Sequence, residues 1–206
     1  MNRGHYLRGM KRLRRGDEAP LFVGMEYRGK QIKLENYRGK KVLLAFHAFG
    51  SCPFCNLRVR ELTERYNQWN HEEIEMIHVF PSSKEIIAKF AGKNDPRFLI
   101  ISDPSKSLYP AYGAGKSIIG FLSGFMRLKK LFKALKVVNL FKTLTQSDAA
   151  LHQMPSDFII DEKGIVLGAF YANSTGDNVE IEAIENLLKT KKEMQKVASD
   201  YELIAV

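Results

Sequence analysis

The sequence predicts an α/β fold in which a mixed β-sheet is flanked by helices on both faces. Three observations support this prediction. Short, almost wholly apolar segments alternate with helical segments, which is typical of strands buried on both faces of a sheet. A proline and a capping signature open helices directly after such strands. Near the C-terminal end, two strand-like segments flank Glu162-Lys163-Gly164, which indicates an antiparallel hairpin.

The elements are expected in the following order. A short strand at 32–34 precedes KVLLAFH at 41–47, which is apolar enough for a central strand. A helix is expected over 53–69, because it begins with proline and carries oppositely charged pairs four residues apart. The remaining elements are a strand at 74–80, a helix opened by Ser82-Ser83-Lys84-Glu85 and ending near 91, a strand at 98–101, a short helix to 112, hairpin strands at 158–161 and 165–171, and a final helix over 179–197.

The length and composition indicate one globular domain. The chain has 206 residues, of which 45% are apolar and 27% charged, and its two cysteines exclude a disulfide-stapled miniprotein. We expect a basic, flexible arm at 1–16 and a single domain at 17–199 with an insertion at 116–148. Since the arm lacks an apolar stretch and a cleavage site, it is not a secretory signal, and we expect a cytoplasmic protein.

The net charge of +9 is concentrated in two segments. The arm carries six basic residues and segment 116–147 carries seven, and neither contains an acidic residue. On a helix, the inserted segment would have an apolar arc and a basic arc. Such a helix either packs on the domain with a solvated basic face or meets an anionic membrane surface or an acidic partner. No motif for nucleic acid is present, so none is expected as a partner.

Both cysteines fall in one motif, Cys52-Pro53-Phe54-Cys55, between a buried strand and a helix. Cys52 is expected at the N-cap, where free backbone N–H groups and the helix dipole favour a thiolate. Cys55 follows one turn later and can form a short-loop disulfide with Cys52. Such a pair can attack a disulfide or a peroxide with one sulfur and resolve the product with the other.

The alternatives are half of a zinc site and plain burial of two thiols. Zinc would need two further nitrogen or sulfur ligands. The histidines show no paired ligand spacing, and we expect neither a metal nor another cofactor. The five histidines are His5, His47, His71, His78 and His152.

Residues 16–190 resemble the AhpC/TSA (peroxiredoxin-like, redoxin) family, in its branch with a Cys-Pro-aromatic-Cys motif. The resemblance implies a thioredoxin-like fold with an N-terminal β-hairpin extension and a thiol-dependent oxidoreductase activity. It also implies a thiol electron donor of the thioredoxin or glutathione type and a homodimer. The matching segments are Gly16-Asp17-Glu18-Ala19-Pro20, 39–46, Ser51-Cys52-Pro53-Phe54-Cys55-Asn56, Ser102-Asp103-Pro104, Tyr109 with Tyr112-Gly113, and 154–164.

Two departures from the family pattern bear on the reaction. Peroxiredoxins place Thr or Ser three residues before the reactive cysteine, but Phe49 stands there and Ser51 is offset. They also place an arginine just before the Phe-Ile-Ile-Asp strand, where this chain has Pro155. The resemblance to thioredoxin-like reductases instead implies a cis Met154–Pro155 bond beside the cysteines. The alternative is a trans proline that starts the strand.

We therefore expect disulfide exchange, with Cys52 attacking and Cys55 resolving. Peroxide reduction by the same cysteines is the alternative. A redox sensor that docks on a membrane or partner through the basic segment is a third hypothesis, of another class. His47, five residues before Cys52, either stabilises the thiolate and moves its proton or is an ordinary half-buried strand residue.

Overall fold

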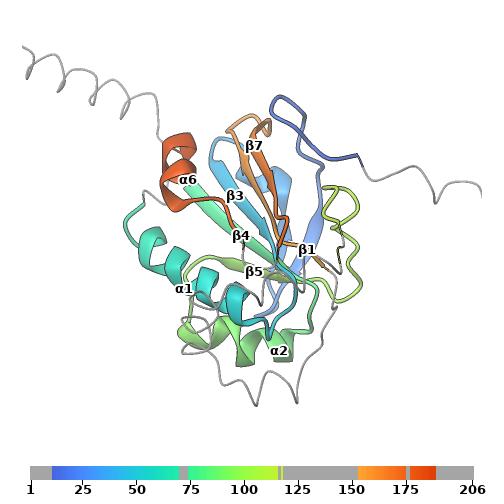
Figure 1. The fold of residues 1–206 in the computed structure, drawn as a ribbon, viewed down its shortest axis with the longest axis vertical. Coiled ribbons are helices and arrows are strands. Elements are labelled where there is room, and N and C mark those ends of the chain that lie inside the picture. Colours follow the sequence, from blue (N-terminus) through green and yellow to red (C-terminus); the bar gives the residue numbers. More distant parts are fainter. Residues whose placement is uncertain (1–10, 70–73, 116, 118–152, 175–176, 189–206) are drawn as a thin grey trace, which may run out of the picture.

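The computed structural model describes residues 11–69, 74–115, 117, 153–174 and 177–188. It contains a seven-stranded sheet with the strand order β2-β1-β5-β4-β3-β6-β7 (Figure 1). The pairs β3–β4 and β4–β5 are parallel and the other neighbours are antiparallel, so the sheet is mixed, as predicted. The strands are β1 (Val23–Glu26), β2 (Gln31–Lys33), β3 (Lys41–Phe46), β4 (Ile74–Phe80), β5 (Leu99–Ser102), β6 (Ser156–Ile160) and β7 (Val166–Tyr171).

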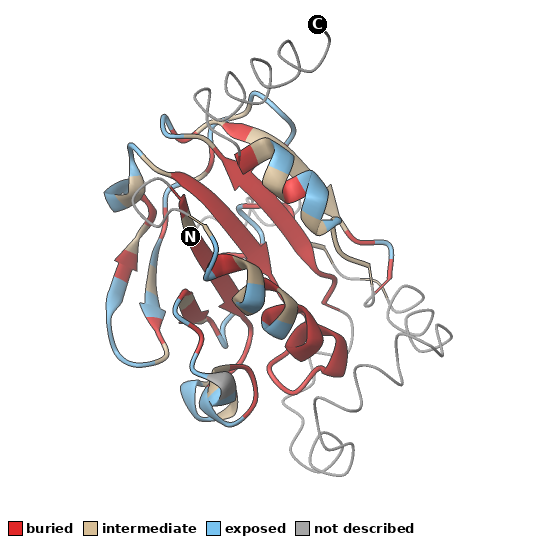
Figure 2. Cartoon of the chain, turned by 90° about the vertical axis from the view of Figure 1, so that its left-hand side faces the viewer, coloured by how far each residue is buried: buried red, intermediate tan, exposed pale blue. Residues whose placement is uncertain are grey.

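One face of the sheet is covered by the α-helices of the described residues. These are α1 (Pro53–Tyr66), α2 (Lys84–Lys89) and α6 (Ile181–Leu188). Their inward side chains, including Leu62, Ile87 and Ile184, form one apolar cluster with the adjacent face of the central strands. Every residue of β3 is buried, and Figure 2 shows the central strands of the sheet in the colour of buried residues. The cluster therefore holds α1, and with it the two cysteines, against the central strands.

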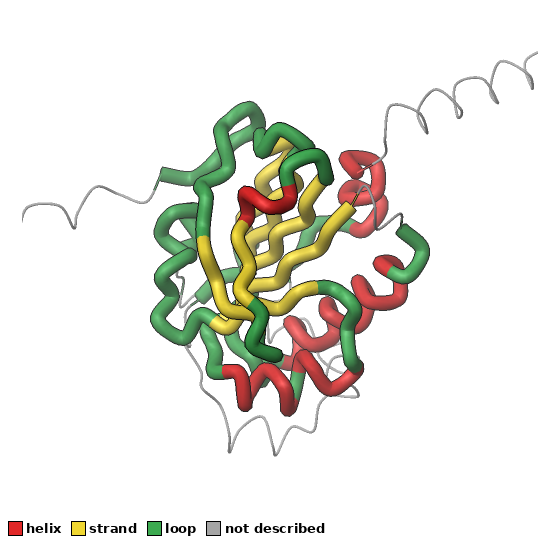
Figure 3. Tube along the Cα trace, turned by 180° about the vertical axis from the view of Figure 1, so that it is seen from behind, coloured by secondary structure: helices red, strands yellow, loops and turns green. Residues whose placement is uncertain are grey.

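The other face is covered by irregular chain rather than by a regular α-helix in the part that the structure describes (Figure 3). Its cluster joins the N-terminal residues Leu13 and Phe22, the short 3-10 helix η1 (Leu34–Tyr37) and the segment 108–114. Phe46 packs edge-on against Tyr109 and Phe158 there. In these residues, the α-helices thus lie on one face of the sheet, and the helix on the other face is the 3-10 helix η1.

The short helix expected to end at 112 is replaced by turns. The Asp103 carboxylate accepts the backbone N–H groups of Ser107 and Leu108, which competes with helical hydrogen bonding. A second 3-10 helix, η2 (Ala91–Asn94), follows α2. Strand β1 was not predicted, although the resemblance implied the hairpin that it forms with β2.

Several expectations concern residues at or beyond the edges of the described ranges. Residues 11–16 lie against the sheet: Leu13 is buried, its N–H donates to the Tyr171 hydroxyl, and Gly16 donates to Val166. Residues 1–10 and, apart from Ser117, the insertion 116–148 lie outside the described residues, and α6 is described only to Leu188. Within the described ranges, no helix has the length and apolar character needed to cross a bilayer.

Candidate active site

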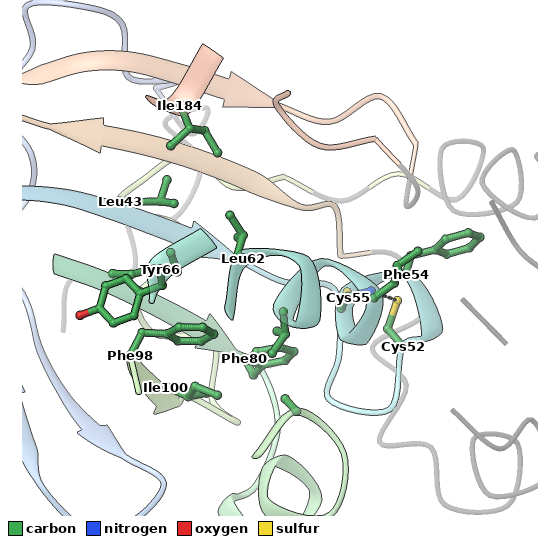
Figure 4. Packing of buried hydrophobic residues seen from close by; sticks show 14 of the residues in the cluster. Leu43, Cys52, Phe54, Cys55, Leu62, Tyr66, Phe80, Phe98, Ile100 and Ile184 are labelled. Carbon is green, nitrogen blue, oxygen red and sulfur yellow. Dashed lines mark hydrogen bonds between the residues drawn. The ribbon is translucent and has the colours of Figure 1, made fainter. Parts of the chain in front are cut away.

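The two cysteines bound the first turn of α1. Cys52 is the N-cap, with φ −61° and ψ 121°, and Pro53 occupies the first helical position, both as predicted. The backbone nitrogen of Cys55 donates to the Cys52 sulfur over 3.4 Å, which brings both sulfurs to the same end of the helix (Figure 4). Both are free thiols, and Cys52 and Cys55 are only 1% and 3% exposed.

The loop before the helix is held by side-chain hydrogen bonds. The Asn56 amide donates to the carbonyl oxygens of Gly50 and Cys52, at 2.8 and 2.7 Å. The N–H of Gly50 donates to the Ser82 hydroxyl at 2.8 Å. A Cβ atom at Gly50 would lie 2.8 Å from a methyl carbon of Ile86, so glycine is needed for this approach to α2. Asn56, which sequence reasoning did not select, thus fixes the backbone that carries Cys52.

The more acidic of the two thiols is Cys55. Burial alone would raise its pKa, but hydrogen bonds from Cys52 and His47 outweigh this and hold the pKa well below the ordinary value. At Cys52, burial and the neighbouring Cys55 raise the pKa well above it, although backbone N–H groups act in the opposite direction. These two directions run opposite to the expectation that the helix N-terminus makes Cys52 the thiolate, which stays a prediction. Desolvation of a fully buried sulfur exceeds the stabilisation by the N-terminal N–H groups.

His47 lies directly after β3, is buried, and interacts with the Cys55 thiol rather than the Cys52 thiol. Its Nε2 atom lies 2.6 Å from Nδ1 of His78 on β4. Its backbone oxygen accepts the hydroxyl of Tyr109 at 2.9 Å. Sequence reasoning did not select His78, because a histidine inside an apolar strand carries no visible signal of a partner.

The AhpC/TSA family model matches residues 15–169, which include strands β1 to β6, most of β7, the cysteine pair and the Met154–Pro155 segment. The chain belongs to the AhpC/TSA family. It is a thiol-dependent oxidoreductase with a thioredoxin-like fold, as the sequence predicted.

Known relatives and solved structures agree with this assignment. Peroxiredoxin Bcp of Escherichia coli is 25% identical over 150 residues, which cover 69% of this chain and 96% of that protein. A PrxQ variant of Xylella fastidiosa has a TM-score of 0.61 at 15% identity and covers 91% of this chain and 99% of its own. The thiol peroxidase from Chromobacterium violaceum has a TM-score of 0.59 at 17% identity, with coverages of 86% and 87%.

The other residues selected from the AhpC/TSA pattern lie near the end of β3. Antiparallel pairing of Phe46 with Ser156 places Pro155, the residue before Ser156, alongside His47. Among the described residues no peptide bond is cis, so the expectation of a cis Met154–Pro155 bond is wrong. A trans proline can start a strand because its missing N–H lies outside the hydrogen-bonded ladder. The backbone N–H of Met154 donates a hydrogen bond to the carbonyl oxygen of Gly115.

Ser51 is completely buried, and its hydroxyl oxygen has no hydrogen-bond partner among the described residues. A hydroxyl can both donate and accept a hydrogen bond, and Ser51 directly precedes Cys52 in the chain. In the same described part of the chain, no three His, Cys, Asp or Glu side chains lie close enough to hold a metal ion.

Proposed function

We propose that this protein is a thiol peroxidase in which Cys52 reduces a small hydroperoxide and Cys55 then closes a disulfide with it. The observation that carries the proposal is the burial of both sulfurs, 1% and 3% exposed. A disulfide in another protein must align with the attacking sulfur, which needs an accessible thiol. A hydroperoxide is small enough to approach a buried one. The peroxiredoxins among the relatives support the same choice.

Cys52 is proposed as the attacking sulfur because it is the N-cap at the start of α1 (Figure 4), whereas the Cys55 thiol, one turn into the helix, interacts with His47. The Cys55 thiolate accepts the Cys52 proton through the hydrogen bond between their side chains. The Cys52 sulfur then attacks the terminal oxygen of the hydroperoxide, the O–O bond breaks, and an alcohol leaves after protonation. Cys52 is left as a sulfenic acid.

Cys55 resolves the sulfenic acid. Its sulfur bonds to the Cys52 sulfur, the S–O bond breaks, and water leaves. A thiol donor then reduces the disulfide by exchange. A small thiol of the glutathione type fits the buried pair, whereas a thioredoxin-type donor requires the first turn of α1 to open. A cytoplasmic location and a homodimer accompany this proposal as predictions.

Disulfide exchange is the second candidate, because the two cysteines flank a single helical turn and both are reduced. Stopped-flow mixing of the reduced protein with hydrogen peroxide, an alkyl hydroperoxide and a small disulfide separates the two reactions. Faster oxidation by a hydroperoxide supports the peroxidase. Faster oxidation by the small disulfide supports disulfide exchange instead of the peroxidase, provided that peroxides oxidise the protein no faster than they oxidise a free thiol in solution.

Trapping the intermediate with dimedone tests the roles of the two sulfurs. In Cys55→Ser, hydroperoxide should leave a dimedone adduct on Cys52. In Cys52→Ser, adduct formation should be strongly reduced. An adduct that forms equally fast on Cys55 in Cys52→Ser would exchange the two roles.

A further inference from the structure

A pair of buried histidines lies behind the Cys55 thiol. Nε2 of His47 and Nδ1 of His78 are 2.6 Å apart, and the two rings are nearly coplanar, with an interplanar angle of 13°. His47 stacks on Phe80 and His78 stacks on Phe98, with ring centroids 4.2 and 4.4 Å apart. The aromatic rings therefore fix the orientation of both imidazoles.

The short distance means that one proton lies between the two nitrogens. His47 contacts His78 through Nε2, so its other ring nitrogen, Nδ1, is not engaged by His78. His47 also interacts with the Cys55 thiol. If His47 takes the Cys55 proton, its ring needs one acceptor on each side. The Cys55 thiolate is one acceptor and the bare Nδ1 of a neutral His78 is the other.

His78 is suited to remain neutral. It is fully buried, and burial, followed by the charges of His47 and Arg58, lowers its pKa well below the ordinary value. The titratable or charged groups that face the pair are Cys52, Cys55 and Arg58, all at or near the start of α1, and the Tyr109 hydroxyl, which is bonded to the His47 backbone. Among these described neighbours no carboxylate contacts either ring, so the Cys55 thiolate is the counter-charge of a protonated His47.

We propose that His47 and His78 form a proton relay for Cys55, in which His47 takes and returns the Cys55 proton and His78 positions His47 by accepting its Nε2–H. His47 interacts with the Cys55 thiol and acts on it directly, whereas His78 acts through His47 as a positioning residue. The role of the relay in turnover rests on the proposed peroxidase function. Its effect on the ionisation of Cys55 can be measured in the absence of a peroxide.

The relay supplies the protons that the peroxidase steps require. Protonated His47 gives its proton to the leaving alkoxide, which departs as an alcohol. It then takes the proton of the Cys55 thiol, and the Cys55 thiolate attacks the sulfenic sulfur of Cys52. The leaving hydroxide takes the His47 proton and departs as water. In sum, two thiols and one hydroperoxide give one disulfide, one alcohol and one water.

Absorbance of the thiolate near 240 nm, followed against pH in the reduced protein, tests the relay without substrate. His78→Phe keeps a ring on Phe98 but removes the acceptor, and the midpoint of the thiolate titration should rise by about one pH unit, which corresponds to a tenfold smaller ionisation constant. His78→Asn places an acceptor near the former Nδ1 and should reverse much of this rise. Phe158→Leu disturbs buried packing in the cluster on the other face of the sheet and should leave the titration nearly unchanged.

Nuclear magnetic resonance of the histidine rings in the wild-type protein provides a test that no folding defect can obscure. We expect the ring nitrogen signals of His47 to shift between the reduced and the disulfide form, because the Cys55 thiolate is lost, and those of His78 to shift less. His47 signals that are the same in both forms overturn the relay. So does a thiolate titration that is unchanged in His78→Phe, or shifted equally in Phe158→Leu.

The outcomes also separate the relay from the peroxidase. If hydroperoxides fail to oxidise the protein while the titration midpoint still rises in His78→Phe, the proposed function is wrong and the relay stands. If hydroperoxides react and the variants titrate as the wild type does, the relay is wrong and the peroxidase stands.

Discussion

The backbone nitrogen of Cys55 lies 3.4 Å from the sulfur of Cys52 and donates a hydrogen bond to it. The same turn of α1 therefore holds both sulfurs and supplies a backbone donor to one of them. Burial still raises the pKa of Cys52, whereas His47 helps to lower that of Cys55. Within the pair, these directions make Cys55 the more acidic thiol and Cys52 the thiol that donates a proton to it.

The two single-cysteine variants should titrate in opposite directions. In Cys52→Ser, the remaining Cys55 keeps His47 as a neighbour, so its pKa should stay below that of an ordinary thiol. In Cys55→Ser, the remaining Cys52 keeps its burial, so its pKa should lie above it. Absorbance near 240 nm against pH measures both. Equal titration midpoints in the two variants would contradict the assignment of the acidic thiol to Cys55.

Asn56 should be needed for both stability and reactivity. Asn56→Leu removes the donors to the Gly50 and Cys52 carbonyl oxygens. Losing buried hydrogen bonds of this kind costs about 1–3 kcal/mol, and the freed loop should slow peroxide oxidation. Urea unfolding and stopped-flow oxidation measure the two effects. Asn67→Ala, at the exposed C-terminal end of the same helix, should change neither.

His78 should make the folded protein less stable in acid. Its folded pKa lies below the ordinary value of 6.5, so the unfolded chain binds a proton that the folded chain does not as pH falls through that value. The stabilisation is present above 6.5 and is lost below it, by at most about 1.4 kcal/mol per pH unit. Urea unfolding of the disulfide form between pH 7 and pH 5 measures this loss, and His78→Phe should weaken the dependence. An equal slope in both proteins would show that His78 binds a proton as readily folded as unfolded.

The packing beneath α1 should carry a large part of its stability. Leu62 is fully buried in the cluster between α1 and the sheet, so Leu62→Ala should cost about 2–5 kcal/mol of unfolding free energy. Leu21 is 60% exposed, and Leu21→Ala should cost less than about 0.5 kcal/mol. Denaturant unfolding of both variants tests the difference. Similar losses would mean that Leu62 does not anchor the helix.

The elements that could be predicted are those with a continuous local signal. Strand β4 runs from Ile74 to Phe80, as expected, because five of its seven residues are apolar. Strand β1 is short, contains glycine and exposes Val23 and Met25, and it exists because β2 and β5 pair with it. Pairing across the sheet is not visible in a segment read alone.

The features of the candidate site also fall into those that the local sequence predicts and those that depend on contacts between distant segments. The position of Cys52 at the N-cap followed from the local sequence, whereas the acidity of Cys55 depends on His47, which another element brings near. His78 meets His47 only because β3 and β4 pair in parallel with Ala45 beside His78. The network that controls the protons thus arises from strand register and burial rather than from the motif.

The most direct test of the peroxidase is mass spectrometry of the reduced protein after one equivalent of an alkyl hydroperoxide. Cleavage after Lys41 and Arg58 gives a peptide, residues 42–58, that contains both cysteines. We predict that this peptide loses two hydrogen atoms and contains the Cys52–Cys55 disulfide, with one alcohol formed per disulfide. A peptide that remains reduced while the hydroperoxide persists, or that gains oxygen without forming the disulfide, would contradict the account.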